Sequence, residues 1–334
     1  MNKEPGTNET TEYDFEAARV RIAEIAIETP VLSSPGLTEK AYTPVTLKLE
    51  NLQITGSFKL RGAANKILSL TEEERQRGVV TCSSGNHGLA VSYVSGTLGI
   101  PATVVIPEWI DELKLEAIRK HGAEAVLYGD SYDAAEERSF ELEDELGLTY
   151  VHPFDDPFTI AGQGTICLEL LDQLPSVDTI IVPLSGGGLI GGIACAAKNH
   201  NPDIRVIGVS ASNARVMYEC LKVGQPESFP EDATVASALS GGIGLDNDHT
   251  FRLVQNFVDE HILVSEDEIK GAMAFAAKEH KIVVEGGGAV AVAAILADKL
   301  GAVGNSLAVV VSGGNINMEQ FDKILREQTA KEED

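Results

Sequence analysis

The chain has 334 residues, with 51 acidic and 26 basic side chains and a net charge of −25. This charge argues strongly against nucleic acid and anionic membranes as partners, because both are polyanions. No apolar run reaches the roughly 18 residues that span a bilayer, and the polar residues 1–13 are unlike a signal peptide, so we expect a cytoplasmic protein.

The first predicted unit carries an unusually placed lysine. An apolar strand at 45–49 precedes a turn and a helix over 58–70, and Lys59 falls in the first helical turn. A cation gains nothing from the partial positive charge of a helix N-terminus. The position suits an amine that loses its proton, because a desolvated lysine with a lowered pKa attacks carbonyl carbons. Taken alone, it also fits an ordinary surface lysine.

The second unit ends in a polar loop. A strand over 78–82 is followed by a helix that runs to about residue 99. The loop between them consists of Ser83, Ser84, Gly85, Asn86, His87 and Gly88. Its N–H groups and hydroxyls can hold a carboxylate, and Asn86 can donate to a phenolate oxygen. A helix N-cap needs only one such residue, and this loop has several.

Short strands follow at 102–106, 125–128 and 149–152, and the strand over 179–182 ends in a glycine-rich segment. The segment is Ser185, Gly186, Gly187, Gly188, Leu189, Ile190 and Gly191. Consecutive glycines before a helix turn backbone N–H groups toward an anion, and the phosphate of a cofactor is the natural ligand. The segment also matches the dinucleotide pattern G-x-G-x-x-G, which indicates an oxidoreductase. However, the next strand, 205–209, ends without the carboxylate that would hold a ribose.

The last strong strand, 307–311, ends at Ser312, Gly313, Gly314 and Asn315. The Ser312 hydroxyl can meet a ring nitrogen, although a strand-end turn explains the segment equally well by itself. Glu285 begins a helix of small residues, and its carboxylate either lines the site or stabilises the helix N-terminus.

Continuous apolar strands that alternate with helices predict an α/β fold of parallel-rich, twisted sheets flanked by helices. Ligands of such sheets bind beyond the carboxyl ends of the strands, where the polar and glycine-rich loops fall. A chain of this length favours two domains. We expect a small α/β domain at 76–151, inserted in a large cofactor-binding domain formed by 1–75 and 152–334.

These segments together resemble those of one enzyme family. The matching residues are Lys48–Asn51, Gly56–Ala63, Ser84–Gly88, Ala161–Thr165, Gly186–Gly188 and Ser312–Asn315. In order and spacing they are similar to the serine/threonine dehydratases, fold-type II (tryptophan synthase β-like) pyridoxal-phosphate enzymes that include serine racemase. The resemblance runs from about residue 14 to 325. It implies a homodimer that acts on a small, amino-acid-like substrate.

The resemblance also implies the roles of the site residues. Lys59 would bind pyridoxal 5'-phosphate covalently, Phe58 would pack on its ring, and the backbone of Ser185–Leu189 would hold its phosphate. Asn86 would bond the phenolic oxygen and Ser312 the pyridine nitrogen, with Glu285 also at the cofactor. The substrate carboxylate would bind to Ser83, Ser84, Gly85 and His87.

The implied reaction is β-elimination of water from a 3-hydroxy amino acid, which gives a 2-keto acid and ammonia. Lys59 would take the Cα proton as general base. Ser312 is a weaker proton donor to the ring nitrogen than an aspartate, so a long-lived carbanion is disfavoured and elimination is favoured.

Some positions depart from the family pattern. Ser185 stands where the family usually has a fourth glycine. Many relatives bind a divalent cation through an acidic pair after the strand at 205–209, but Ser210 and Val216 occupy these positions, so we expect no metal site. No other cluster has metal-ligand spacing. We also expect no regulatory domain of the type that gives isoleucine feedback.

Four alternatives stay open. Pro183–Gly191 and Ser240–Asn247 resemble the dehydratase branch associated with hydroxyectoine utilisation, which would fit an acidic, salt-adapted protein. Ser84 is the position of a second proton donor in serine racemase-like relatives, on the ring face opposite Lys59, and this implies an isomerase. An oxidoreductase rests on the glycine pattern alone, and a non-catalytic binding protein is disfavoured by the presence of Lys59.

Overall fold

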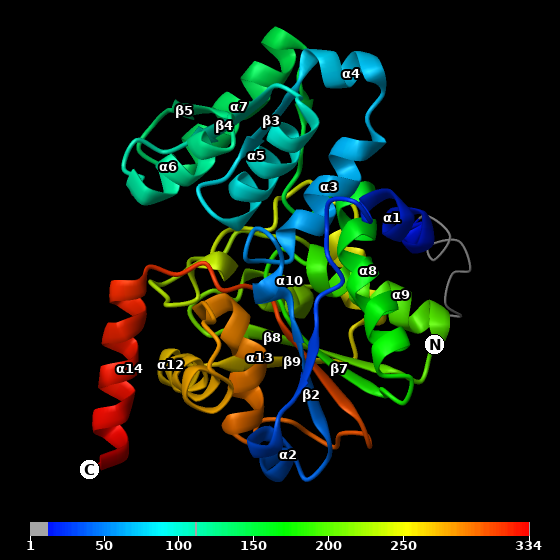
Figure 1. Cartoon of the computed structure of the whole chain (residues 1–334), viewed down its shortest axis with the longest axis vertical. Helices are drawn as coiled ribbons and strands as arrows, with labels where there is room; N and C mark the ends of the chain where they lie inside the picture. Colours follow the sequence, from blue (N-terminus) through cyan, green and yellow to red (C-terminus); the bar gives the residue numbers. More distant parts are fainter. Residues whose placement is uncertain (1–12, 111, 334) are drawn as a thin grey trace.

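The computed structural model describes residues 13–110 and 112–333, and its strands form two sheets (Figure 1). The larger sheet has six strands in the order β1-β2-β10-β7-β8-β9, and the smaller has four in the order β5-β4-β3-β6. All neighbouring pairs are parallel except β1 with β2. The strands are β1 Val31–Ser33, β2 Val45–Leu49, β3 Val79–Cys82, β4 Ala102–Ile106, β5 Glu124–Leu127, β6 Thr149–Tyr150, β7 Thr179–Pro183, β8 Arg205–Ala211, β9 Glu260–Val264 and β10 Leu307–Val311.

Helices alternate with the strands and flank both sheets, so the predicted α/β fold class is confirmed. The α-helices are α1 Phe15–Ile22, α2 Pro35–Ala41, α3 Lys59–Ser69, α4 Glu72–Arg77, α5 Asn86–Leu98, α6 Glu112–Lys120, α7 Tyr132–Leu146, α8 Pro157–Gln173, α9 Gly188–His200, α10 Val216–Val223, α11 Thr250–Phe257, α12 Glu266–Phe275, α13 Gly286–Leu296 and α14 Met318–Glu333. Shorter turns are the 3₁₀-helices η1 Glu50–Leu52 and η2 Ser237–Leu239 and the π-helix η3 Ala276–His280. Within the described ranges, no helix is both long and apolar enough to cross a membrane.

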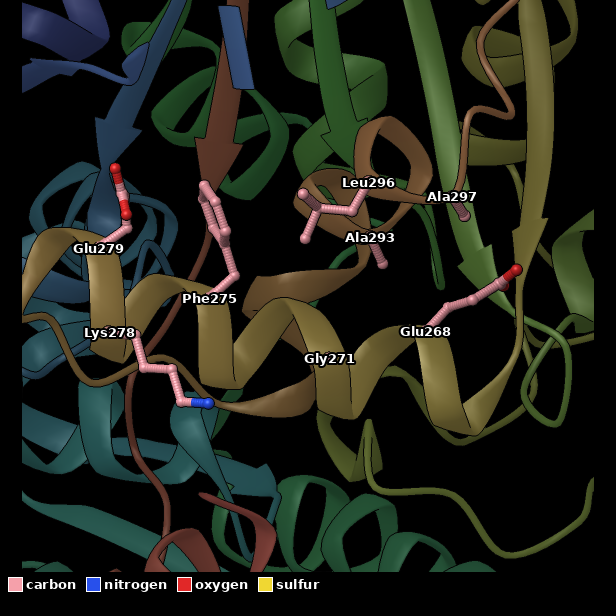
Figure 2. Close-up of a pocket in the computed structure, with 8 residues that line it drawn as sticks. All are labelled: Glu268, Gly271, Phe275, Lys278, Glu279, Ala293, Leu296 and Ala297. Carbon is pink, nitrogen blue, oxygen red and sulfur yellow. The ribbon is translucent and has the colours of Figure 1, made fainter. Parts of the chain in front are cut away.

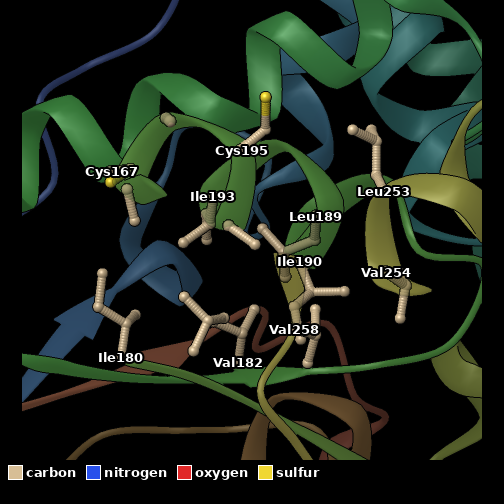
Figure 3. Close-up of a cluster of buried hydrophobic side chains, with 14 of the residues drawn as sticks. Cys167, Ile180, Val182, Leu189, Ile190, Ile193, Cys195, Leu253, Val254 and Val258 are labelled. Carbon is tan, nitrogen blue, oxygen red and sulfur yellow. The ribbon is translucent and has the colours of Figure 1, made fainter. Parts of the chain in front are cut away.

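The large sheet separates two hydrophobic cores, because successive side chains of a strand point to opposite faces. Ile180 and Val182 of β7 face α9, where Ile190 and Ile193 pack against them (Figure 3). Ile181, between them in sequence, belongs to the core on the other face, with α12 and α13. Both faces of the central strands are therefore buried, which explains their continuous apolar sequence.

The small sheet lies within residues 79–150 and has its own core. Val79 and Val104 pack with α5 and α6 on one face, and Val80 and Val105 pack with α7 on the other. The domain boundaries predicted from the sequence remain a prediction.

Helix α3 lies at the junction of the two sheets (Figure 1). Leu60 and Ile67 of α3 belong to the core of the small sheet, together with Val91 of α5. The opposite side of α3 meets α8, where a Cβ on Gly162 would come within 2.5 Å of the Arg61 carbonyl oxygen. This close approach sets the first turn of α3, which carries Lys59, at the junction.

Candidate active site

Lys59 is the first residue of α3 and is partly buried. The turn before it needs a glycine, because Gly56 has φ +74° and a Cβ there would meet Asn315 Oδ1 at 2.3 Å. Lys59 Nζ donates a hydrogen bond of 2.6 Å to the Pro153 carbonyl oxygen. Burial lowers the pKa of Lys59 to about 8, so desolvation alone accounts for the lowered value that the sequence predicts.

The glycine loop that connects β7 to α9 packs on Phe154. A Cβ on Gly186 would lie 2.6 Å from the Phe154 ring, and one on Gly188 would lie 2.8 Å from the Phe154 carbonyl oxygen. Gly187 has φ +89°, a conformation that favours glycine. The first N–H groups of α9 have no partner within the helix, so this end of α9 suits a phosphate. Ser185 Oγ donates to the Leu239 carbonyl oxygen at 2.7 Å, which ties the loop to η2.

Asn86 lies in a chain of hydrogen bonds between two other side chains. Asn315 Nδ2 donates to Asn86 Oδ1 at 2.7 Å, and Asn86 Nδ2 donates to Glu285 Oε1 at 2.7 Å. Asn315 also donates to the Thr55 carbonyl oxygen at 2.8 Å, which fixes its amide. The Asn86 amide therefore has one orientation, and its Nδ2 keeps a second N–H for a ligand oxygen. Burial raises the pKa of Glu285 to about 7, so this carboxyl is partly protonated near neutral pH.

Ser312 follows β10 and is buried at the start of α13, with its Oγ 3.5 Å from the Gly287 carbonyl oxygen. Its own carbonyl oxygen accepts from the Phe58 N–H at 3.0 Å, so the two predicted cofactor residues are directly connected. The Phe58 ring centroid lies 5.3 Å from Lys59 Nζ. Ser57 Oγ, also buried, has no hydrogen-bond partner among the described residues.

The loop predicted to bind the substrate carboxylate lies between β3 and α5. His87 is buried, and burial with the nearby charge of Lys59 lowers its pKa to about 3. The imidazole is therefore neutral, and its Nε2 lies 2.8 Å from the Val151 carbonyl oxygen, to which it donates. The side chain thus holds the loop against the end of β6. Ser83 and Ser84 are partly exposed and Gly85 is exposed, so this part of the loop is open to a ligand.

Four charged side chains form a buried network beneath the first turn of α3. Arg61 donates two hydrogen bonds to Glu50, both 2.8 Å long, and two to Glu169, of 2.6 and 2.9 Å. Lys48 Nζ donates to Glu169 at 2.6 Å, so two cations face two carboxylates. Because Arg61 follows Lys59 by two residues, it anchors this turn on the side of α3 roughly opposite Lys59.

The positions that could correspond to a cation site hold no acidic side chain. Ser210 Oγ donates to the Leu184 carbonyl oxygen at 2.7 Å, and Val216 is buried in the core beside α9. In the part of the chain that the structure describes, no group of three His, Cys, Asp or Glu side chains could hold a metal ion. Cys82, Cys167, Cys195 and Cys220 are all buried, and none of the four forms a disulfide.

The structure also has two clefts, one away from these residues and one beside them. One, of about 450 Å³, is lined by α12, η3 and α13 and includes Glu268, Phe275 and Leu296 (Figure 2). The other, of about 500 Å³, is lined by 51–56, by residues of α5 and by Asn315, so it borders the site.

The structure brings the predicted residues together from loops far apart in the sequence. Lys59 Nζ lies over the ring of Phe58, and its acceptor Pro153 precedes Phe154, which packs on the glycine loop. Pro153, Phe154 and Glu169 are participants that the sequence reasoning missed. Asn315 was part of a recognised motif, but its contact with Asn86 was not predicted.

Comparisons with known proteins identify the family of the chain. A family model described as pyridoxal-phosphate dependent enzyme matches residues 22–313. The L-threonine ammonia-lyase of Thermotoga maritima is 42% identical over 95% of this chain and 79% of its own length. The catabolic L-threonine dehydratase of Staphylococcus aureus is 41% identical, over 93% of this chain and 91% of its own length. Among solved structures, maize serine racemase is 35% identical, with a TM-score of 0.88 over 96% of this chain and 98% of that one. The processed threonine deaminase isoform 2 of Solanum lycopersicum is 31% identical, with a TM-score of 0.89 over 98% and 90%.

Proposed function

The chain belongs to the family of pyridoxal-phosphate dependent enzymes, and from this premise we propose that it is a dehydratase and ammonia-lyase of a 3-hydroxy amino acid. The reaction removes water from the amino acid, and hydrolysis of the resulting enamine gives a 2-keto acid and ammonia. Threonine is the first substrate to test, because the relatives from Thermotoga maritima and Staphylococcus aureus are named for it.

The residues of the site fit the cofactor. The glycine loop at the start of α9 offers N–H groups to a phosphate, and the buried Ser57 Oγ has no partner among the described residues. Lys59 would hold the cofactor, Ser185–Leu189 its phosphate, and Phe58 its ring. Asn86 would donate to its phenolic oxygen and Ser312 to its ring nitrogen, with Glu285 beside Asn86. When bound, the cofactor supplies an electron sink for the charge that develops at the substrate Cα.

The observation that carries the proposal is the environment of Lys59. An amine with a pKa of about 8 exchanges its proton near neutral pH, which a general base must do. The Pro153 carbonyl oxygen holds Nζ in place, 2.6 Å away. Ser83, Ser84 and Gly85, which are open to a ligand, would bind the substrate carboxylate through their N–H groups and hydroxyls.

The test is incubation of the purified protein with threonine, serine and hydroxyectoine-derived compounds, read by ammonia and keto acid. We expect keto acid from at least one hydroxy amino acid, and a loss of about 10³-fold or more in a Lys59→Ala variant. Without keto acid from any substrate of the panel, the dehydratase assignment is wrong, whereas the family assignment stands. Turnover of the hydroxyectoine-derived compounds alone would indicate the alternative branch named from the sequence.

A second candidate function is amino-acid racemisation. It is favoured by the likeness to maize serine racemase and by Ser84, which lies in the loop before α5. Chiral analysis of L-serine incubated in deuterated water separates the two functions. Deuterated D-serine that disappears in a Ser84→Ala variant would support racemisation, and keto acid without D-serine would support elimination alone.

We further infer that the chain acts as a homodimer, as the family resemblance implies, and that it acts in the cytoplasm, as its sequence predicts. Light scattering on the purified holoenzyme tests the first statement, and a mass near that of one 35.5 kDa chain would refute it. Cell fractionation tests the second.

A further inference from the structure

The loop of residues 152–156 connects β6 of the small sheet to α8, and it contacts both parts of the candidate site. Pro153 supplies the acceptor for Lys59 Nζ, and Phe154 packs on the glycine loop. The position of this short loop therefore fixes where Lys59 lies relative to the glycine loop.

The loop is fixed at its beginning by His152. Burial lowers the pKa of His152 to about 4, so its imidazole is neutral. Its Nδ1 accepts from the N–H of Phe154 at 3.2 Å and from that of Asp155 at 2.7 Å. These bonds close a tight turn around Pro153.

The other end is fixed by Asp155, whose carboxylate accepts three backbone N–H groups from another segment. Oδ2 accepts from Asp248 at 2.8 Å, and Oδ1 accepts from His249 at 3.0 Å and Thr250 at 2.7 Å. Thr250 is the first residue of α11, so the carboxylate lies at the N-terminus of that helix, where a negative charge is stabilised.

Helix α11 and the loop of residues 152–156 both contact the glycine loop. A Cβ on Gly187 would come within 2.8 Å of Thr250 Cβ, and one on Gly191 within 3.1 Å of Leu253 Cβ. Phe154 contacts Gly186 and Gly188. The glycine loop therefore packs against both α11 and the loop that Asp155 connects to α11.

We propose that Asp155 is a positioning residue, which sets cofactor affinity and orientation by holding Pro153 and Phe154 against Lys59 and the glycine loop. Its carboxylate oxygens are engaged by the N–H groups of residues 248–250, so it acts through the loop that it holds. Asp156, the next residue, has a different function, because it caps α8 through the Thr159 N–H at 2.9 Å and pairs with Lys66 of α3 at 2.5 Å. The proposal rests on the proposed function, because it assumes that the cofactor binds at this site.

The test compares Asp155→Asn with a matched control, Asp178→Asn. The Asp178 carboxylate also accepts two backbone N–H groups, from Asn305 at 2.6 Å and Ser306 at 3.4 Å. It immediately precedes β7, at the end of the strand opposite the glycine loop. The holoenzymes are compared by equilibrium dialysis of pyridoxal phosphate and by circular dichroism of the cofactor's visible band per bound cofactor.

We expect Asp155→Asn to bind pyridoxal phosphate about tenfold more weakly and with a changed dichroism, because three charge-assisted bonds are weakened. Asp178→Asn should keep the wild-type affinity and dichroism, even if its melting temperature falls as much as that of Asp155→Asn. The proposal is wrong if Asp155→Asn keeps the wild-type affinity and dichroism, or if the control changes equally. If Asp155→Asn does not fold, Asp155→Ser, which can still cap α11 with one bond, takes its place. Neither readout requires turnover, so an absence of keto acid with the wild-type protein would not affect this comparison.

Discussion

The buried amine of Lys59 should destabilise the cofactor-free protein, and replacing it with methionine should show by how much. The pKa of Lys59 falls from its ordinary value of 10.5 to about 8, which corresponds to a destabilisation of the folded state by about 3 kcal/mol. Below pH 8 the amine is protonated in both the folded and the unfolded state, so the full destabilisation applies. Between pH 8 and 10.5 the folded state releases the proton and the cost disappears.

We therefore expect Lys59→Met to be more stable than the wild type at pH 7. Loss of the Nζ bond to Pro153 offsets about 1 kcal/mol, which leaves a gain of about 2 kcal/mol. This gain should vanish or reverse by pH 10.5, because the wild-type free energy of unfolding rises with pH over this interval and that of the variant does not. The Met side chain keeps the length of the apolar stem, so packing changes little.

The assay is urea unfolding of both cofactor-free proteins at pH 7, 8.5 and 10, with Lys222→Met as the control. Lys222 is exposed on α10, so its replacement should leave the free energy of unfolding nearly unchanged at each pH. A Lys59→Met variant that is less stable than the wild type at pH 7, or whose difference does not change with pH, would refute the reasoning.

Three further perturbations test other parts of the site. Glu169→Gln leaves Arg61 and Lys48 facing one carboxylate, so the free energy of unfolding should fall by about 3 to 5 kcal/mol in urea titrations; an unchanged midpoint would contradict the buried network. Folded Glu285 keeps its proton to about pH 7, whereas an unfolded glutamate loses it near 4.5. Wild-type stability should therefore fall as the pH rises from 4.5 to 7, and Glu285→Gln should remove that part of the pH dependence of the melting temperature. If the melting temperatures of the wild type and the variant change in parallel with pH, the raised pKa of Glu285 is wrong. Gly186→Ala would place a Cβ 2.6 Å from the Phe154 ring and should weaken pyridoxal-phosphate binding by about tenfold or more in equilibrium dialysis, whereas Gly271→Ala, which has open space around it, should not; equal affinities would show that the loop is not tightly enclosed.

Much of the fold could be predicted, because the central strands are apolar on both faces. The strands at 102–106 and 307–311 have the predicted bounds. β9 was missed because Glu260–Val264 begins with polar residues and lies at an edge of the sheet. β1 was missed because it has only three residues, and β6 ends before the predicted residue 152 because the chain turns into the loop that carries Pro153.

Site residues could be proposed from the sequence where chemistry depends on a side-chain type in a motif, as for Lys59 and Asn86, and their roles stay predictions. They could not be proposed where a backbone carbonyl or a packing contact acts, as with Pro153 and Phe154, because neither requires a distinctive residue type. Glu169 gave a usable signal, since it is a lone carboxylate between Leu168 and Leu170 on a helix that is otherwise apolar there. A charge in such a place needs a buried partner.

The most direct test of the account is to reduce the purified holoenzyme with borohydride and locate the cofactor by peptide mass spectrometry. The account predicts one pyridoxyl group per chain, attached to the ε-nitrogen of Lys59. A label on any other lysine, or a protein that remains unlabelled after incubation with excess cofactor, would contradict it.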